Sequence, residues 1–108
     1  MKLNHLGVTV SDVAGARRFL ETYFGLEGIG KNNPKLTHLR DDDGFVISLF
    51  EGEPESTHIG FIQETEDQVN AVYARLKGDG FDVPPPTRSH GWTFYFVAPG
   101  GLNVEVVC

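Results

Sequence analysis

Two histidines open similar segments of the chain, and both are residues that can bind metal. His5 begins His-Leu-Gly-Val-Thr-Val, and His58 begins His-Ile-Gly-Phe-Ile. A carboxylate, Glu105, lies in a third strand-like segment, Asn-Val-Glu-Val-Val. Two imidazoles and one carboxylate are ligands that a divalent transition metal accepts, and three protein ligands leave positions open for substrate or water. The sequence therefore predicts a metal site formed by His5, His58 and Glu105.

The chain consists of two copies of one small unit. When His5 is aligned with His58, the amphipathic helix and the terminating glycine that follow His5 align with a second helix and a second glycine. At the far end of each copy, the alignment pairs Ser48 with Glu105. Ser48 is a poor metal ligand, so we interpret it as a small residue that lines the substrate pocket.

Each copy is expected to fold as β-α-β-β-β. Ser11 or Asp12 caps the first helix and Gly25 stops it, whereas residues 65–68 form a capping box for the second. The expected strands are residues 3–10, 26–31, 35–40 and 45–50 in the first copy, and 57–63, 81–83, 92–97 and 102–107 in the second. This pattern predicts one α+β domain over residues 1–108, with module one at 1–51, module two at 56–108 and a polar linker at 51–56.

Alternation along the strands predicts which way the candidate ligands point. The apolar residues flanking His5, His58 and Glu105 fall on the opposite parity, so the three side chains would face away from the helices. Two modules facing each other would then form an open, cupped mixed sheet around a cavity. Trp92 and Tyr95 have opposite parity, and at most one of them can face that cavity unless a bulge intervenes.

Each candidate also has an ordinary structural interpretation. A strand histidine on a polar face is usually solvated, and Glu105 could face solvent, although a charge within an apolar strand needs water, a cation or a metal. His90 lies in a loop, where a general acid/base or anion-binding role competes with simple solvation. His38 and Arg40 share a strand face, and we interpret both as surface or pocket rim, with surface preferred.

Composition narrows the class of protein. With 40% hydrophobic and 22% charged residues, the chain is ordinary for a soluble globular domain. The net charge of −6, without a basic cluster, argues against nucleic acid and anionic membranes as partners. No apolar run approaches the length of a membrane span and no signal peptide precedes the first strand, so we expect a cytoplasmic protein. The single cysteine, Cys108, cannot form an internal disulfide.

Several motifs together resemble the vicinal oxygen chelate superfamily, which includes glyoxalase I, extradiol dioxygenases, methylmalonyl-CoA epimerase, fosfomycin resistance thiol transferases and bleomycin resistance proteins. The motifs are Asn-His-Leu-Gly-Val-Thr-Val at 4–10, Phe-Gly-Leu at 24–26, Thr-His-Ile-Gly-Phe at 57–61 and Ala-Pro-Gly-Gly-Leu-Asn-Val-Glu at 98–105. The resemblance covers nearly the whole chain. It implies paired β-α-β-β-β modules that hold a metal from the first, fifth and eighth strands, and often the fourth.

Carried over by position, the resemblance assigns His5, His58 and Glu105 as metal ligands. The fourth-strand position is Ser48, where glyoxalase I has a carboxylate, so the set resembles those of the extradiol dioxygenases and fosfomycin transferases instead. The stretch around Tyr95 is similar to the latter and implies that this residue lies near the substrate. Thr9, Ser48, Tyr95 and Trp92 are the expected substrate-binding residues, and no residue is assigned a catalytic proton transfer.

The expected function is that of a metal-dependent enzyme whose cation acts as a Lewis acid on a small substrate with adjacent oxygens. Lyase, isomerase, dioxygenase and thiol transferase reactions all suit such a site, and the divalent metal could be Fe, Mn, Ni, Co or Zn. The resemblance also implies a homodimer, with the site within one chain or across two. The alternative is a metal-free protein of the bleomycin-resistance type that binds a small molecule, with aromatic side chains as stacking surface.

Overall fold

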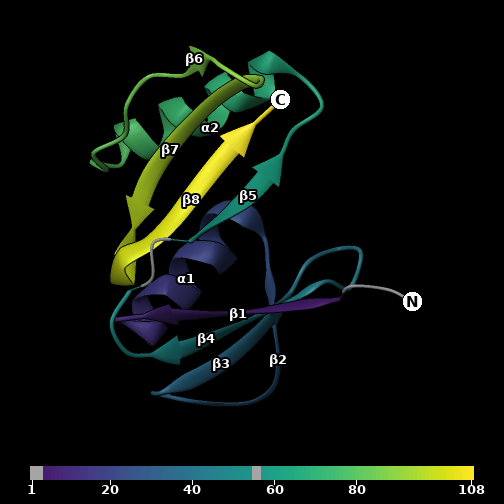
Figure 1. Ribbon diagram of the computed structural model, residues 1–108, viewed down its shortest axis with the longest axis vertical. Helices are drawn as coiled ribbons and strands as arrows, with labels where there is room; N and C mark the ends of the chain where they lie inside the picture. Colours follow the sequence, from purple (N-terminus) through teal and green to yellow (C-terminus); the bar gives the residue numbers. More distant parts are fainter. Residues whose placement is uncertain (1–3, 55–56) are drawn as a thin grey trace. The chain divides into compact units, whose positions relative to one another are not determined.

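The structure is a computed structural model that describes residues 4–54 and 57–108. It divides into two compact units, the first formed by residues 4–54 with Ala98–Leu102 and the second by Thr57–Val97 with Asn103–Cys108. Each unit contains a four-stranded mixed sheet and a helix (Figure 1). The predicted α+β plan of two β-α-β-β-β modules is confirmed.

The first unit follows the predicted order of elements. Its sheet has the order β1-β4-β3-β2, with β1 and β4 parallel and the other pairs antiparallel. The 3-10 turn η1, although distant in sequence, belongs to this unit because the backbone N–H of Ser11 donates to Gly100 O at 2.8 Å. The elements are β1 His5–Val10, α1 Val13–Phe24, β2 Glu27–Asn33, β3 Leu36–Arg40, β4 Val46–Glu51 and η1 Pro99–Gly101.

Helix α1 begins and ends where its flanking residues dictate. Asp12 is the N-cap, since its carboxylate accepts from the backbone N–H of Gly15 at 2.9 Å. Gly25 ends the helix in the left-handed conformation at a φ of 67°, which costs a glycine little. The apolar stripe between the caps packs α1 against β3 and β4. Its buried members are Val13, Ala16, Phe19 and Leu20.

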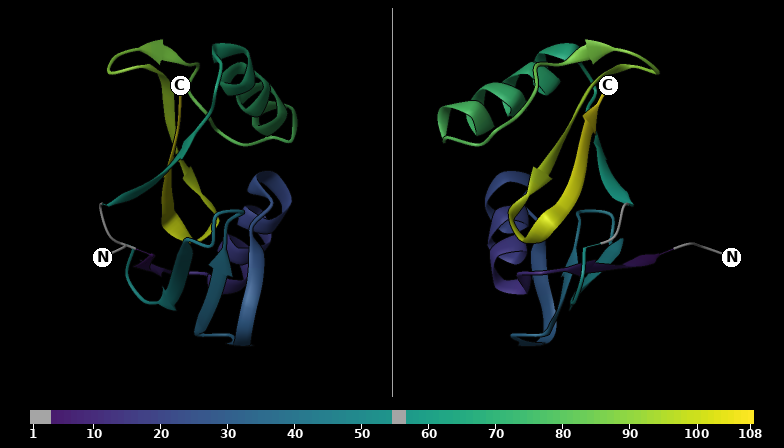
Figure 2. Two further views of the ribbon diagram at one scale, coloured as in Figure 1. Left: turned by 90° about the vertical axis from the view of Figure 1, so that its right-hand side faces the viewer. Right: turned by 60° about the vertical axis from the view of Figure 1, so that its left-hand side comes forward.

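The second unit repeats this arrangement. Its sheet has the order β5-β8-β7-β6, with β5 and β8 parallel and β6 and β7 antiparallel. Figure 2 shows α2 against one face of this sheet. The elements are β5 His58–Ile62, α2 Glu66–Gly78, β6 Thr87–Arg88, β7 Trp92–Ala98 and β8 Leu102–Val107.

Helix α2 has the predicted capping box. The hydroxyl of Thr65 accepts from the backbone N–H of Gln68, and the Gln68 side chain accepts from the backbone N–H of Thr65. Val69 and Leu76 are fully buried, and Tyr73 meets Phe94 of β7 edge to face at 5.9 Å. The helix thus covers one apolar face of its sheet and leaves the face of His58, Tyr95 and Glu105 uncovered by α2.

The prediction of a strand at residues 81–83 is wrong. The backbone N–H of Phe81 instead donates to Leu76 O at 3.1 Å, which uses it to close the end of α2. The prolines at 84–86 lack an N–H for a sheet ladder, so pairing resumes only at β6. The other expected strands and both helices lie within a few residues of their predicted bounds, while residue 3 and residues 55–56 of the predicted strand and linker lie outside the described residues.

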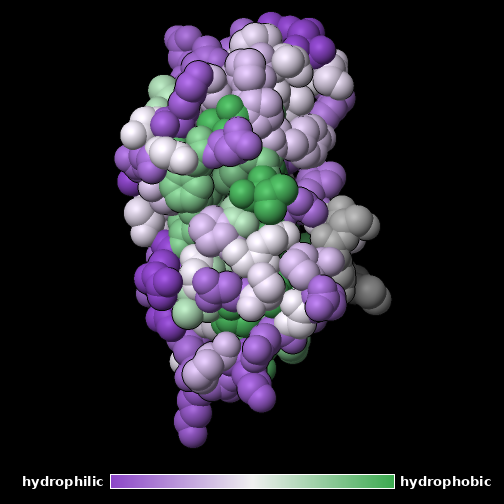
Figure 3. Space-filling view, turned by 90° about the vertical axis from the view of Figure 1, so that its left-hand side faces the viewer, coloured by the Kyte–Doolittle hydropathy of each residue, from purple (hydrophilic) through white to green (hydrophobic). Residues whose placement is uncertain are grey.

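The core and the surface follow the alternation in part. Val8 and Val10 of β1 are buried as predicted, but Leu6, which shares their parity, is 43% exposed. Other large apolar side chains are also exposed, and Figure 3 shows hydrophobic residues reaching the surface on one side of the molecule. The exposed large apolar side chains among the described residues include Phe50, Ile62 and Val97. Among the described residues, no helix is both long and apolar enough to cross a membrane.

Candidate functional site

The two units place their candidate ligands at equivalent positions. In the first unit Gly7 of β1 pairs with Ser48 of β4, and in the second Gly60 of β5 pairs with Glu105 of β8. Each glycine lies two residues beyond the histidine that opens its strand. The register therefore reproduces the sequence alignment of Ser48 with Glu105.

His58 and Glu105 face each other in the second unit. The His58 Nε2 atom lies 3.4 Å from Glu105 Oε2, with the imidazole 47% exposed and the carboxylate side chain 9% exposed. A ring nitrogen and a carboxylate oxygen bound to one tetrahedral cation at about 2.0 to 2.2 Å lie about 3.4 Å apart. The spacing of these two atoms therefore fits neighbouring ligands of a single divalent metal.

The second oxygen of Glu105 is hydrogen-bonded within the protein. Thr93 of β7, itself buried, donates its hydroxyl to Oε1 at 2.9 Å, and His90 Nε2 lies 2.5 Å from the same oxygen. An ionised carboxylate can only accept, so the imidazole of His90 donates here. One oxygen of Glu105 is thus held by two donors, and the other is directed toward His58.

These contacts keep Glu105 ionised. Burial acts to raise the pKa of Glu105, but hydrogen bonds from Tyr95, Thr93 and His90, together with the charge of a protonated His90, outweigh it and lower the pKa below its ordinary value. The same hydrogen bond raises the pKa of Tyr95, helped by burial and by the negative charge of Glu105. At neutral pH, Glu105 is an anion and Tyr95 a neutral hydrogen-bond donor.

Tyr95 and Trp92 occupy opposite faces of β7, as their parity predicts. The Tyr95 ring meets His58 edge to face at 5.3 Å, so it stands beside the imidazole and carboxylate. Trp92 instead donates its indole N–H to Asn70 of α2 at 2.8 Å, and Arg88 lies over its ring at 5.1 Å. Of the two aromatic residues, only Tyr95 shares the face of Glu105.

In the first unit, Ser48 has an imidazole partner. His38 of β3 pairs with Ser48 in the sheet, and its Nδ1 lies 2.7 Å from the Ser48 Oγ. In the second unit, the backbones of Trp92 and Cys108 exchange hydrogen bonds, and continuing this antiparallel register sets Tyr95 opposite Glu105. His38 therefore takes in the first unit the place that Tyr95 takes in the second.

The remaining predicted site residues of the first unit lie on β1. His5 is exposed, and its Nδ1 lies 2.9 Å from the side-chain oxygen of Asn4. Thr9 is half-buried and pairs with Phe50 of β4. The Nε2 atom of His5 corresponds to the ring atom that His58 directs at Glu105.

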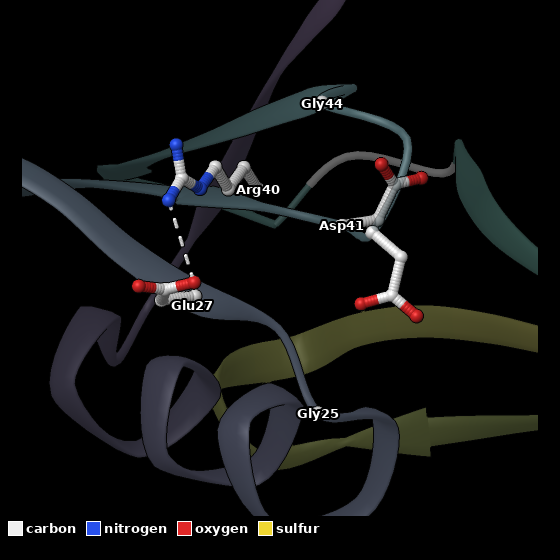
Figure 4. A pocket seen from close by; sticks show the side chains of 6 residues that line it. Gly25, Glu27, Arg40, Asp41 and Gly44 are labelled. Atoms are coloured by element: carbon white, nitrogen blue, oxygen red, sulfur yellow. Dashed lines mark hydrogen bonds and ion pairs between the residues drawn. The ribbon is translucent and has the colours of Figure 1, made fainter.

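The predicted site residues neither form a preassembled cluster of three metal ligands nor line the pocket found in the first unit. In the described ranges 4–54 and 57–108, no group of three or more His, Cys, Asp or Glu side chains is arranged to hold a metal ion. A hollow of about 250 Å³ lies among the loops of the first unit, where Arg40 contacts Glu27 at 3.5 Å (Figure 4). Its lining is Gly25, Glu27, Arg40, Asp41, Asp42 and Gly44, which includes none of the predicted site residues.

Two partners of Glu105 were not assigned from the sequence. Thr93 shares the parity of Tyr95 in β7, so the alternation that places Tyr95 near the site could have identified it. For His90 the sequence does not choose between solvation and function, because nothing in the pattern connects a loop residue to a strand 15 positions further on. Only the pairing of β7 with β8 brings this imidazole to the carboxylate.

Two four-stranded mixed sheets, each with a helix packed on one face and equivalent polar positions on the other, define a protein built from paired β-α-β-β-β modules. The chain belongs to the Glyoxalase/Bleomycin resistance protein/Dioxygenase superfamily, whose family model matches residues 2–106. The sequence resemblance to the vicinal oxygen chelate superfamily is thereby confirmed. None of the curated proteins compared with the chain matches it.

Solved structures of this superfamily superimpose on nearly the whole chain. A protein from Bacillus cereus described as a possible glyoxalase is 46% identical, with a TM-score of 0.91 and coverage of 100% of this chain and 99% of that one. Lactoylglutathione lyase from Agrobacterium tumefaciens is 19% identical, with a TM-score of 0.84 and coverage of 98% and 92%. The fosfomycin resistance protein FosX from Listeria monocytogenes, complexed with Mn(II) and sulfate, is 24% identical, with a TM-score of 0.79 and coverage of 99% and 89%.

Proposed function

We propose that this protein is a divalent-metal-dependent enzyme that acts on a small substrate with adjacent oxygen atoms. His5, His58 and Glu105 are the proposed metal ligands. The reaction belongs to the lyase, isomerase, dioxygenase or thiol transferase classes found in the superfamily. The metal is a divalent cation such as the Mn(II) held by FosX, with Fe, Ni, Co and Zn as the other candidates.

The contact between His58 and Glu105 carries this proposal. A buried anion facing an imidazole nitrogen at 3.4 Å has the donor types and the spacing of two ligands on one cation. Burial of an ionised carboxylate is costly unless charge or hydrogen bonds compensate it. The lowered pKa of Glu105 means that it needs no deprotonation at neutral pH to bind a cation.

His5 is assigned as the third ligand by equivalence. It opens β1 as His58 opens β5. In each strand the glycine two residues further on is paired with the equivalent position of the parallel strand, which is Ser48 in β4 or Glu105 in β8. The proposed site brings this histidine to His58 and Glu105 either within one chain or from a second copy in a homodimer. Size-exclusion chromatography with light scattering, with and without added metal, tests the dimer directly.

The chain's own residues would bind and orient the substrate. Tyr95 stands beside His58, is 44% exposed and is neutral at physiological pH. Its one hydroxyl proton is donated to Glu105, so its oxygen can accept a hydrogen bond from a substrate hydroxyl. Ser48 with its His38 partner and Thr9 are proposed to line the substrate site. Trp92, the other residue expected there from the sequence, directs its indole at Asn70 of α2, on the face of β7 opposite to Tyr95. When bound, the cation would supply Lewis acidity to the substrate oxygens.

Metal analysis of purified protein tests the proposal. The wild type should retain about one divalent ion per site after gel filtration, and His58→Ala and Glu105→Gln should each lose it, because three protein ligands are the usual minimum for such a site. His38→Ala is the matched control, since it removes an imidazole that is not a proposed ligand. A wild type that binds no divalent metal, or a His58→Ala protein that binds it as tightly as the wild type, contradicts the proposal.

The alternative function is metal-free binding of a small molecule, as in the bleomycin-resistance type. It is favoured by the hydrogen bonds of Glu105, because Thr93, His90 and Tyr95 already satisfy much of this carboxylate without a cation. In that case the same metal analysis finds none, and an aromatic ligand quenches the fluorescence of Trp92 equally in wild type and His58→Ala. Stoichiometric metal in the wild type excludes this alternative.

A further inference from the structure

The carboxylate of Glu105 is held asymmetrically, and this asymmetry suggests a role for His90. Oε1 accepts from Thr93 at 2.9 Å and from His90 at 2.5 Å, whereas Oε2 faces His58 at 3.4 Å. Two donors therefore hold Oε1, and Oε2 is the oxygen that faces the proposed ligand His58. Tyr95 is a third donor to the same carboxylate.

The two imidazoles are distinguished by their distances from the carboxylate. The 3.4 Å between His58 Nε2 and Oε2 is the edge expected between two ligands of one cation. The 2.5 Å between His90 Nε2 and Oε1 is a hydrogen-bond distance, too short for neighbouring ligands at ordinary metal bond lengths. His58 is thus spaced as a co-ligand of Glu105, and His90 as a donor to it.

The fold holds the loop of His90 close to β8. The backbones of Trp92 and Cys108 exchange hydrogen bonds of 3.2 and 3.0 Å at the end of the sheet. A Cβ on Gly91 would meet Cys108 O at 2.5 Å, so the chain passes too close to β8 for a larger residue. The His90 ring remains 54% exposed, which means that it reaches Glu105 without forming part of the core.

We propose that His90 is a positioning residue for the metal site. It donates from Nε2 to Oε1 of Glu105 and, with Thr93, keeps that oxygen out of the coordination sphere, so that Oε2 alone binds the cation. This inference rests on the proposed metal-dependent function. Hydrogen bonds to coordinating carboxylates fix their orientation and influence both metal affinity and geometry.

The proposed role has a consequence for substrate binding. A carboxylate that binds through one oxygen occupies one coordination position, whereas a bidentate carboxylate occupies two. A substrate that chelates through two adjacent oxygens needs two open positions. By restricting Glu105 to one oxygen, His90 leaves room for the second substrate oxygen.

Cobalt-substituted protein provides a test that needs no substrate. The visible absorption of Co(II) reports coordination number, and chelator competition gives the dissociation constant. His90→Ala should weaken Co(II) binding about tenfold or more and change the intensity of the visible band. His90→Gln, whose amide can still donate to Oε1, should restore both toward the wild type, and Ser89→Ala in the same loop should leave both unchanged.

A second measurement observes the imidazoles without mutating them. Long-range ¹H–¹⁵N spectra of the Zn(II)-loaded wild type should show His58 Nε2 as a metal-bound nitrogen, and His90 Nε2 still carrying its proton. If His90 Nε2 is instead metal-bound, it is a ligand and the positioning role is wrong. The role is also refuted if His90→Ala matches the wild type in both spectrum and affinity.

The two proposals fail in different ways. Failure of the wild type to bind Co(II) overturns the metal-dependent function and this inference together. A wild type that binds Co(II), loses it in His58→Ala and is unaffected by His90→Ala overturns the positioning role alone. Circular dichroism of each variant shows whether the fold is retained, which the exposure of the His90 ring leads us to expect.

Discussion

Replacing Thr93 with valine removes the most deeply buried hydrogen bond to Glu105. Valine has nearly the shape of threonine, so the packing of β7 should survive. The Thr93 hydroxyl has one proton, shared between Glu105 Oε1 at 2.9 Å and the backbone oxygen of Val106 at 3.0 Å. The variant therefore leaves a buried carboxylate with one donor fewer.

The size of the effect follows from the charge of the acceptor. A hydrogen bond to an ionised group contributes about 1.5 to 3 kcal/mol, compared with about 0.5 to 1.5 kcal/mol for a neutral pair. Thr93 is 2% exposed, so water cannot readily replace its hydroxyl. We expect Thr93→Val to lower the free energy of unfolding by about 2 kcal/mol at pH 7, which shifts the urea midpoint by about 1 M.

The effect should depend on pH with a definite sign. The folded-state pKa of Glu105 is lowered, so its contribution to stability is present above the unfolded value of about 4.3 and is lost as the pH falls through the folded value. Removing the Thr93 donor moves the folded pKa back toward the ordinary value. The difference in free energy of unfolding between wild type and Thr93→Val should therefore have its largest value at pH 7 and decrease below about pH 4.

Urea denaturation at pH 7 and pH 3 is the assay, with Thr37→Val as the control. Thr37 is an equally buried strand threonine, but its hydroxyl donates to the neutral side chain of Asn32. Its replacement should cost less and show little change between the two pH values. The reasoning is refuted if Thr93→Val loses under 0.5 kcal/mol, a value about the size of ordinary surface effects, or if its loss is the same at both pH values.

Two further predictions concern the hydrogen bond of Tyr95 and a glycine with positive φ in the first unit. Tyr95→Phe should raise the pKa of Glu105, because the tyrosine hydroxyl is a donor that lowers it, and a ¹³C titration of the carboxyl carbon should show the shift; an unchanged titration contradicts the assigned hydrogen bond. Gly100→Ala should destabilise the protein by at least about 2 kcal/mol, because the φ of 82° strains alanine and its Cβ would lie 2.8 Å from Asp12 O. Gly25→Ala should cost only about 1 kcal/mol, because the φ of Gly25 is 67° and a Cβ there would meet nothing within 4 Å. Equal losses of stability for the two alanine variants in urea denaturation would rule out the steric explanation for Gly100.

Local signals were sufficient for the secondary structure that positions the site. The cap at Asp12, the capping box at Thr65 and the glycine stop at Gly25 are short-range features that the structure reproduces. The one wrong strand, residues 81–83, failed because the end of α2 and the prolines after it use the backbone differently. There the alternation was too short to outweigh the local chemistry.

The sequence alone determined the repeat, the equivalence of Ser48 with Glu105 and the opposite faces of Tyr95 and Trp92. Each of these follows from a period or an alignment that the backbone must preserve once strands form. The same patterns identified the superfamily, since its motifs lie on those strands.

Only the tertiary structure decided how Glu105 is held. Its burial, its contact with His58 and its hydrogen bonds from Thr93 and His90 depend on which strands pair and in what register. Likewise, His38 meets Ser48 because β3 lies beside β4. A periodic pattern reports the face on which a side chain lies, but pairing between distant segments determines what stands opposite it.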